Sequence, residues 1–254
     1  MVHLQPAYCH LEIEWRIIVI TKEEFTKMQE HSILGTYVKR SDVKRFCEEV
    51  LEYGFAVMYV NPFDVAYAKS IIGDRAGVGT GIGFPQGAAT TKTKVFEGLD
   101  AIDNGATDLD IVINVSRLKD GDSSYVKNEL TEFVKAVKAK KADVVVKVIV
   151  EGVYLTHREK IEVCEIVVAS GADYIKNATG FPLNENFHLG DVKLFKAIVG
   201  DRIGIKASGS IDTVEDAIGA IEFGANRVAN DHAPQWLAEF DDNLWYGKER
   251  SAST

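Results

Sequence analysis

The chain has 254 residues, of which 46% are hydrophobic and 26% charged, with 21 glycines and 5 prolines, as is typical of a globular protein. This composition excludes a collagen-like repeat, low-complexity disorder and a small disulfide scaffold. The formal net charge of −9 argues against a nucleic-acid partner, because a phosphate backbone is bound by a basic surface. No apolar run approaches the roughly 18 residues of a membrane span, so we expect no membrane partner.

Taken in chain order, short β-branched runs alternate with longer amphipathic stretches, which is the pattern of alternating strands and helices. A helix is expected at residues 41–53, where Ser41 and Asp42 can cap it and its apolar residues share one face. Residues 191–198 and 213–223 show the same helical pattern. The expected strands cover residues 32–34, 55–60, 77–84, 109–115, 144–150, 174–176, 203–207 and 227–229.

The expected strands end about 28 residues apart on average, the size of one strand plus one helix. Eight such units without a long linker predict an α/β fold consisting of a single (β/α)8 TIM barrel. A doubly wound open sheet is the main alternative. We expect the barrel to cover residues 30–232, preceded by an N-terminal extension (1–29) and followed by a C-terminal segment with a frayed tail (233–254).

A glycine-rich stretch in the third expected strand resembles a dinucleotide-binding loop. The spacing fails, however, because the third glycine of such a loop would fall on Phe84. Glycine at every second position from Gly77 to Gly83 instead predicts a strand with one bare face, which leaves room for larger side chains opposite.

Charged residues late in apolar strands are the candidates for chemistry, because a barrel forms its active site at the C-terminal ends of its strands. Side chains alternate between the two faces of a strand, and this alternation places Lys206, Lys176 and Asp110 opposite the isoleucines of their strands. All three would then project into the barrel. Lys147 lies early in its strand and is interpreted as structural, whereas Glu151 is either a site residue or a partner for a lysine.

Two lysines in one apolar interior can act in two ways. Each ammonium disfavours the other, which lowers one pKa and frees an amine that can attack a carbonyl and form a Schiff base. The alternative is a salt-bridged lysine–aspartate pair that only stabilises the interior. Spacing alone leaves both open.

Cysteine and histidine spacing limits the compartment and the metal chemistry. The three cysteines are scattered without a CxxC pair, and no early apolar stretch suits a secretory signal, so we expect a cytoplasmic protein. The six histidines show no HxH or HExxH spacing, and the sequence predicts no metal site.

Over about residues 30–232 the chain resembles the deoxyribose-phosphate aldolases of the class I, Schiff-base type. The resemblance rests above all on two lysine-bearing motifs at the ends of the sixth and seventh expected strands. The matching segments are EYGFAVMYVNP (52–62), GFPQGAATTKTKVFE (83–97), GATDLDIVINVSRLKDGD (105–122), VKVIVEGVYLTHREKIEVCEIVVASGADYIKNATGF (146–181) and IGIKASGSIDTVEDAIGAIEFGA (203–225).

The resemblance implies an aldehyde-lyase that needs no cofactor or metal and acts in deoxyribonucleotide catabolism as a homo-oligomer. Its small-molecule substrate would be 2-deoxy-D-ribose 5-phosphate or a related 3-hydroxyaldehyde, cleaved reversibly to acetaldehyde and a second aldehyde, which is glyceraldehyde 3-phosphate for the sugar phosphate. By motif match, Lys176 is the Schiff-base lysine, Lys206 the lysine that tunes it and Asp110 the proton-relay aspartate. The implied substrate-binding residues are Glu30, Ser32, Tyr59, Thr179, Gly180, Gly209, Ser210, Asn230, Asp231 and His232.

The sequence departs from the family pattern at four places. Glu30 stands where the family has aspartate, Tyr59 where it has cysteine, and Asn177-Ala178 where it has Thr-Ser. A Gly-Thr-Ser-Ser-Gly type sequence for the substrate phosphate is replaced by residues 229–233, Ala-Asn-Asp-His-Ala.

The carboxylate of Asp231 in that replaced segment would repel a phosphate. This suggests a related Schiff-base aldolase or retro-aldolase for a non-phosphorylated or otherwise different substrate. Alternatively, Asp231 points away or pairs with His232 and phosphate binds as usual, with N–H groups offered near Gly209. A third hypothesis is a catalytically inactive barrel with a binding role.

Overall fold

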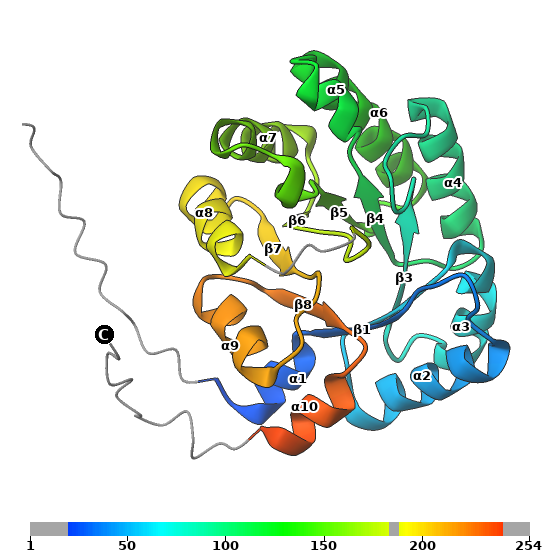
Figure 1. Cartoon of the computed structure of the whole chain (residues 1–254). Helices are drawn as coiled ribbons and strands as arrows, with labels where there is room; N and C mark the ends of the chain where they lie inside the picture. The colour runs from blue at the N-terminus through cyan, green and yellow to red at the C-terminus, as the bar shows by residue number, and fades with distance from the viewer. Residues whose placement is uncertain (1–19, 183–187, 241–254) are drawn as a thin grey trace, which may run out of the picture.

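The computed structural model of the chain describes residues 20–182 and 188–240. In this part of the chain the strands form one closed parallel barrel in the order of the sequence, and the helices surround it (Figure 1). The barrel expected from the spacing is therefore confirmed, and the open doubly wound sheet is not formed. The strands are β1 (Gln29–Ile33), β2 (Val57–Val60), β3 (Gly77–Ile82), β4 (Asp108–Val112), β5 (Val145–Ile149), β6 (Tyr174–Lys176), β7 (Gly204–Ala207) and β8 (Arg227–Asn230).

The helices cover the outside of the barrel with their apolar faces inward. Gly54 and Gly171 follow two of them with positive φ angles of 79° and 82°, where a left-handed residue ends a helix. The described helices are α1 (Lys22–Lys27), α2 (Arg40–Tyr53), η1 (Pro62–Asp64), α3 (Val65–Ile72), α4 (Thr91–Asp103), α5 (Val115–Lys119), α6 (Ser123–Lys140), η2 (Gly152–Tyr154), α7 (His157–Ser170), α8 (Leu189–Val199), α9 (Val214–Glu222) and α10 (Ala233–Glu239).

The first strand begins three residues earlier than the sequence indicated. Gln29, Glu30 and His31 open β1 and are completely buried, so its first half is polar and lacks the apolar pattern of the other strands. Hydrophobic periodicity could not detect this half of the strand, because its side chains are polar and their partners lie on other elements of the fold.

Past residue 232, the expected end of the barrel, the chain forms one more helix. Helix α10 follows β8 as the last helix of the barrel, and its Trp236 is 2% exposed. Beside it lies α1 (Figure 1), and the ring centroids of Phe25 and Phe240 are 4.9 Å apart. The rest of the two predicted extensions, residues 1–19 and 241–254, lies outside the described residues.

The glycine face of β3 makes room for aromatic side chains, as the alternation predicted. A Cβ at Gly79 would lie 2.5 Å from Cζ of Tyr59, and one at Gly81 would lie 2.7 Å from Cβ of Phe84. At these distances a Cβ at either glycine would overlap the aromatic side chain, so the side chain or the strand would have to move. The bare face is therefore what admits a tyrosine ring from β2 into the barrel.

A fully buried ion pair joins α4 to α6 outside the strands. Lys94 Nζ donates to Glu129 Oε1 at 2.9 Å and to the Val112 carbonyl at 2.8 Å, while Glu129 Oε2 accepts from the Asn114 N–H at 3.1 Å. Replacing Lys94 by methionine leaves Glu129 buried without a counter-charge. We expect Lys94→Met to lower the free energy of unfolding by about 3–5 kcal/mol, measured by urea denaturation.

The double variant Lys94→Met/Glu129→Leu is the matched comparison, because it removes both charges and should recover much of that loss. If the free energy of unfolding of Lys94→Met lies within about 1 kcal/mol of the parent value, this role for the pair is contradicted.

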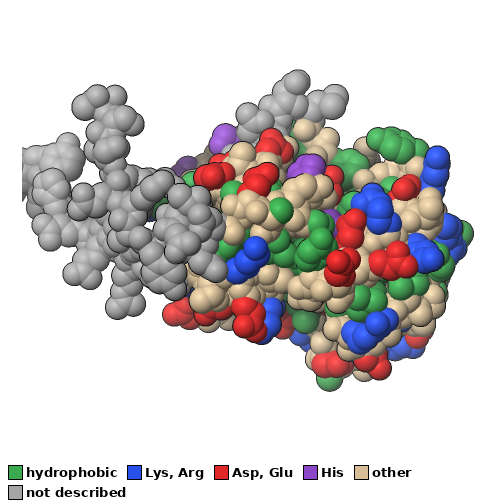
Figure 2. Space-filling view, turned by 90° about the horizontal axis from the view of Figure 1, so that it is seen from below, with side chains coloured by type: hydrophobic (Ala, Val, Ile, Leu, Met, Phe, Trp, Pro, Cys, Tyr) green, Lys and Arg blue, Asp and Glu red, His purple; other side chains and the backbone are tan. Residues whose placement is uncertain are grey.

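Acidic and basic side chains intermingle on the face of the molecule shown in Figure 2, and no extended patch of lysine and arginine is seen there. Within residues 20–182 and 188–240, none of the helices is long and apolar enough to cross a membrane.

Candidate active site

Three residues that the alternation placed inside the barrel meet in the structure. Lys176 ends β6 and pairs in register with Lys206 on β7, so the two lysines lie side by side on the inner face. Asp110 reaches them from β4, and its Oδ2 accepts from Lys176 Nζ at 3.0 Å and from Lys206 Nζ at 2.7 Å. All three are buried, with at most 4% exposure. One carboxylate oxygen therefore bridges two ammonium groups.

A second set of charges lies against this group. Glu30, on β1, forms ion pairs with Lys206 and, at 3.1 Å, with Lys147. Lys147 also pairs with Asp108. The Glu30 oxygens are held by these ion pairs without a hydrogen bond of good geometry. The network contains three lysines and three carboxylates, and Arg227 Nε lies 3.7 Å from Glu30 Oε1 at its edge. Its positive and negative charges therefore balance when one of the lysines is neutral.

Sequence reasoning missed part of this network. Lys147 was interpreted as a structural residue and Asp108 was not assigned to the site. Their partners come from other strands, and Lys147 is separated from Glu30 by more than a hundred residues of sequence. The available signal was the alternation in β4, which places Asp108 on the same face as Asp110. Glu30 was expected to bind substrate, whereas the structure shows it paired with two lysines.

The environment of Lys176 favours its neutral form. Burial, together with the neighbouring Lys206 ammonium, lowers the pKa of Lys176 to about 8, although Asp110 acts in the opposite direction. With a pKa of about 8, roughly a tenth of the Lys176 side chains are neutral at pH 7. A neutral primary amine is a nucleophile toward a carbonyl carbon.

The nearby carboxylates remain ionised. Burial alone would raise the pKa of Asp110, but the ammonium groups of Lys206, Lys176 and Lys147 outweigh it and hold this pKa well below its ordinary value. The same balance between burial and the two flanking lysines lowers the pKa of Glu30. Asp110 is thus an ionised hydrogen-bond acceptor in contact with both lysines.

Tyr59 contacts the same network from β2. Its hydroxyl donates to Asp110 Oδ1 at 2.6 Å and accepts from Lys147 Nζ at 2.9 Å. The Lys206 ammonium lies 3.6 Å from the centroid of its ring. The resemblance implied a substrate-binding role for Tyr59, and the structure places its hydroxyl in contact with protein groups.

Residues that follow the C-terminal ends of β5, β6 and β7 are joined by hydrogen bonds. Glu151 was expected either in the site or paired with a lysine, and its observed partner is Thr179, whose N–H donates to it at 3.0 Å. Burial raises the pKa of Glu151. Asn177 joins β6 to β7, because its Nδ2 donates to the Ser208 carbonyl and its Oδ1 accepts from the Ser208 N–H, both at 2.8 Å. These contacts fix the loop that follows Lys176.

Two glycines bring the loops after β6 and β7 together. Gly180 and Gly209 have φ angles of 84° and 91°, and a Cβ at Gly180 would lie 3.5 Å from the Gly209 Cα. Ser210 has a positive φ of 53°, which a non-glycine residue adopts only under strain. The predicted binding residues Gly180, Gly209 and Ser210 therefore form a tight backbone surface at the same end of the barrel as Lys176.

The replaced segment at the end of β8 is held by local contacts. Asn230 is buried, and its side chain donates to Gln29 Oε1 at 3.0 Å and accepts from the His232 N–H at 2.9 Å. The Ser32 hydroxyl donates to the Asn230 carbonyl at 3.1 Å. The side chains of Asp231 and His232 are 63% and 50% exposed and lie 3.3 Å apart. Pairing with His232, one of the two alternatives for Asp231, is thus observed.

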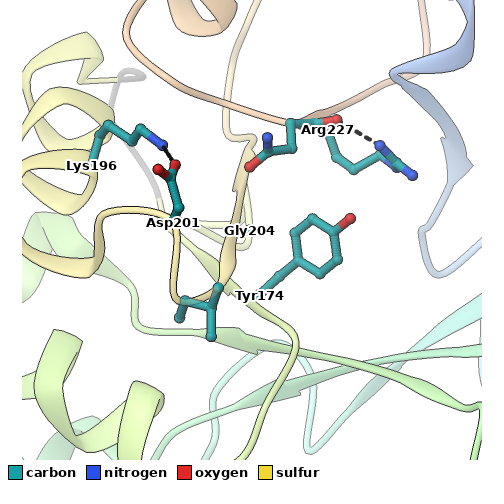
Figure 3. Close-up of a pocket in the computed structure, with 7 residues that line it drawn as sticks. Tyr174, Lys196, Asp201, Gly204 and Arg227 are labelled. Atoms are coloured by element: carbon teal, nitrogen blue, oxygen red, sulfur yellow. Dashed lines mark hydrogen bonds and ion pairs between the residues drawn. The ribbon is translucent and has the colours of Figure 1, made fainter.

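Two cavities lie at opposite ends of the barrel. One of about 440 Å³ follows β3, and its lining residues in that loop and in helix α4 are Gly83, Phe84, Pro85, Gln86, Ala88, Ala89, Thr93 and Glu97. The other, of about 290 Å³, is drawn in Figure 3 and includes Tyr174 and Arg227, the first residues of β6 and β8. The second cavity is at the floor of the barrel, away from Lys176. In the described part of the chain, no group of three or more histidine, cysteine, aspartate or glutamate residues could hold a metal ion.

Comparison with known proteins finds consistent similarity along the barrel. The model of the DeoC/LacD aldolase family matches residues 23–231. The deoxyribose-phosphate aldolase of Thermoanaerobacter pseudethanolicus is 47% identical over 203 residues, which are 80% of this chain and 90% of that protein.

Solved structures show the same fold. The aldolase QR15 superposes with a TM-score of 0.79 at 34% identity, over 85% of this chain and 96% of its own. A tetrameric deoxyribose phosphate aldolase from Aeropyrum pernix gives a TM-score of 0.79 at 25% identity, over 87% of this chain and 92% of its own.

Proposed function

Because the chain belongs to the DeoC/LacD family of aldolases, we propose that it cleaves 2-deoxy-D-ribose 5-phosphate reversibly to acetaldehyde and glyceraldehyde 3-phosphate through an imine on Lys176. The observation that carries this proposal is the bridge from Asp110 Oδ2 to both Lys176 and Lys206. It joins a lysine of lowered pKa to a proton acceptor and to a second proton donor in one buried site.

The first step forms the imine. The neutral Lys176 amine attacks the C1 aldehyde carbon of the open-chain sugar, and the resulting carbinolamine loses water to give a protonated imine. The positive imine nitrogen withdraws electrons from C2. Asp110 and Lys206 lie close enough to Lys176 to give and take the protons that these changes require.

The second step breaks the carbon–carbon bond. Removal of the C3 hydroxyl proton lets the C2–C3 electron pair move toward the imine, which releases glyceraldehyde 3-phosphate and leaves an enamine on Lys176. Protonation of the enamine carbon and addition of water then release acetaldehyde and restore the amine. Asp110, working with Lys206, is assigned to the proton transfers at the hydroxyl and at the carbon. The activity is tested by acetaldehyde release from 2-deoxyribose 5-phosphate, followed by reduction of the acetaldehyde in a coupled assay.

The preference between phosphorylated and non-phosphorylated sugars depends on the acceptor end of the site, at the ends of β6, β7 and β8. The loops after β6 and β7 support phosphate binding, because backbone N–H groups in such turns face anions. Asp231 acts against it, although its exposed carboxylate at the end of β8 is paired with His232 at 3.3 Å. We therefore expect Asp231→Asn to raise kcat/KM for deoxyribose 5-phosphate by about 3–10-fold, mainly through KM.

Cleavage of unphosphorylated deoxyribose by the same variant is the control and should stay unchanged. The gain should shrink as salt is added, since exposed charges are screened. An Asp231→Asn variant with an unchanged ratio of the two kcat/KM values would show that this carboxylate does not act on the phosphate.

A homo-oligomer and a cytoplasmic location stay predictions. The Aeropyrum pernix relative is tetrameric, and this chain exposes large apolar side chains that a second copy could cover, among them Tyr37, Phe63 and Phe96. Cys47 and Cys164 are buried free thiols, which suits a reducing compartment.

A further inference from the structure

The side chain of Tyr59 fills a space inside the barrel that exists because the neighbouring residue on β3 is a glycine. The residue is 2% exposed, and the bare backbone of Gly79 on β3 lies against its ring, where even a Cβ would come within 2.5 Å. A large polar side chain is buried at such a place only with its hydroxyl hydrogen-bonded. The partners of that hydroxyl are Asp110 and Lys147, both part of the charge network.

The direction of the two hydrogen bonds is fixed by chemistry. A lysine ammonium has three donors and no acceptor, so Lys147 can only donate to the Tyr59 oxygen. The hydroxyl proton of Tyr59 must therefore point to Asp110 Oδ1, at an O···O distance of 2.6 Å. Burial, reinforced by the charge of Asp110, raises the pKa of Tyr59 well above its ordinary value, so the hydroxyl keeps this proton.

The two oxygens of Asp110 consequently have separate partners. Oδ1 is held by Tyr59, and Oδ2 accepts from both Lys176 and Lys206. A carboxylate held at one oxygen cannot rotate freely about its Cβ–Cγ bond, so its other oxygen stays between the lysines. The ring also contacts Lys206, whose ammonium lies 3.6 Å from its centroid, a cation–π distance.

We propose that Tyr59 is a positioning residue for the proton-transfer step, because its hydroxyl fixes the orientation of Asp110 between Lys176 and Lys206. It does not contact the reacting carbon and acts through Asp110. The inference deepens the proposed function and rests on it. Its consequence is selective: without the hydroxyl, the Lys176 amine can still form an imine, but the proton that must leave or reach the enamine carbon is transferred more slowly.

Two measurements on the same protein sample separate these steps. Borohydride trapping with acetaldehyde measures imine formation, and exchange of the acetaldehyde methyl protons in D2O, followed by NMR, measures proton transfer at the carbon. For Tyr59→Phe we expect the exchange rate to fall by about 10–100-fold, the size of effect caused by a misplaced catalytic group. Trapping should stay within about twofold of the parent.

The ratio of exchange to trapping is independent of how much of the variant is folded, because both reactions are carried out by folded molecules. Tyr125→Phe is the matched control. It removes a tyrosine hydroxyl on α6 whose hydrogen bond, among the described residues, is one accepted from Thr91 at 3.4 Å, and its ratio should equal that of the parent.

An unchanged ratio in Tyr59→Phe overturns the proposal. Equal losses of trapping and exchange also overturn it, because Tyr59 would then support the site as a whole rather than the proton transfer. These outcomes differ from failure of the proposed function itself, in which the parent protein would give neither trapping nor exchange.

Discussion

The Lys176→Met variant is expected to lose at least about 10⁴-fold in kcat for aldol cleavage, because it removes the amine that forms the imine. Methionine is close to lysine in length and apolar, so it fits the buried site without adding charge. The loss should appear in acetaldehyde release from deoxyribose 5-phosphate under saturating substrate.

Lys44→Met is the matched control, since Lys44 is 60% exposed on α2 and, among the residues that the structure describes, its ion pair is with Glu48 one helical turn away. Its activity should equal that of the parent. Lys176→Met activity within tenfold of the parent would remove Lys176 from the mechanism and restore the alternative in which the lysine–aspartate pair only stabilises the barrel.

The second large effect is a pair of opposite shifts in pH dependence. In the parent, the rate of imine formation should rise with pH and level off above about 8, where Lys176 becomes neutral. Lys206→Met removes a like charge, which raises the pKa of Lys176 and moves this rise to higher pH. Asp110→Asn removes the charge that stabilises the ammonium, so the rise moves to lower pH. Both variants should also lose about 10²–10⁴-fold in kcat, because each removes a proton-transfer group.

The pH dependence of borohydride trapping at low aldehyde concentration measures these shifts directly. Opposite directions are the essential result, because a general disturbance of the site would move both profiles the same way. Profiles that shift together, or that stay at the parent midpoint, would contradict the electrostatic account of Lys176.

The sequence was sufficient to predict the architecture because the barrel repeats one signal eight times. Apolar strands at regular spacing and the glycine alternation of β3 do not depend on distant partners. The start of β1 was missed because Glu30 and its neighbours are buried polar residues, and a run of polar residues in a sequence normally indicates a loop. The last helix was assigned to an extension because α10 has only 7 residues and precedes a polar tail.

The candidate site was predictable only in part. Alternation along single strands placed Lys176, Lys206 and Asp110 inside, since it needs only local sequence. The contacts of Tyr59 and Lys147 could not be found in this way, because each joins strands that are far apart in the chain. The replaced segment at the end of β8 was recognised from the family pattern, but the pairing of Asp231 required the structure.

The central claim is that a covalent imine forms on one particular lysine, and borohydride reduction in the presence of acetaldehyde tests it most directly. The account predicts that the reduced protein carries a single ethyl group, and that peptide mass spectrometry locates it on Lys176. An adduct on Lys206 instead, or cleavage activity that survives reduction with Lys176 unmodified, would contradict it.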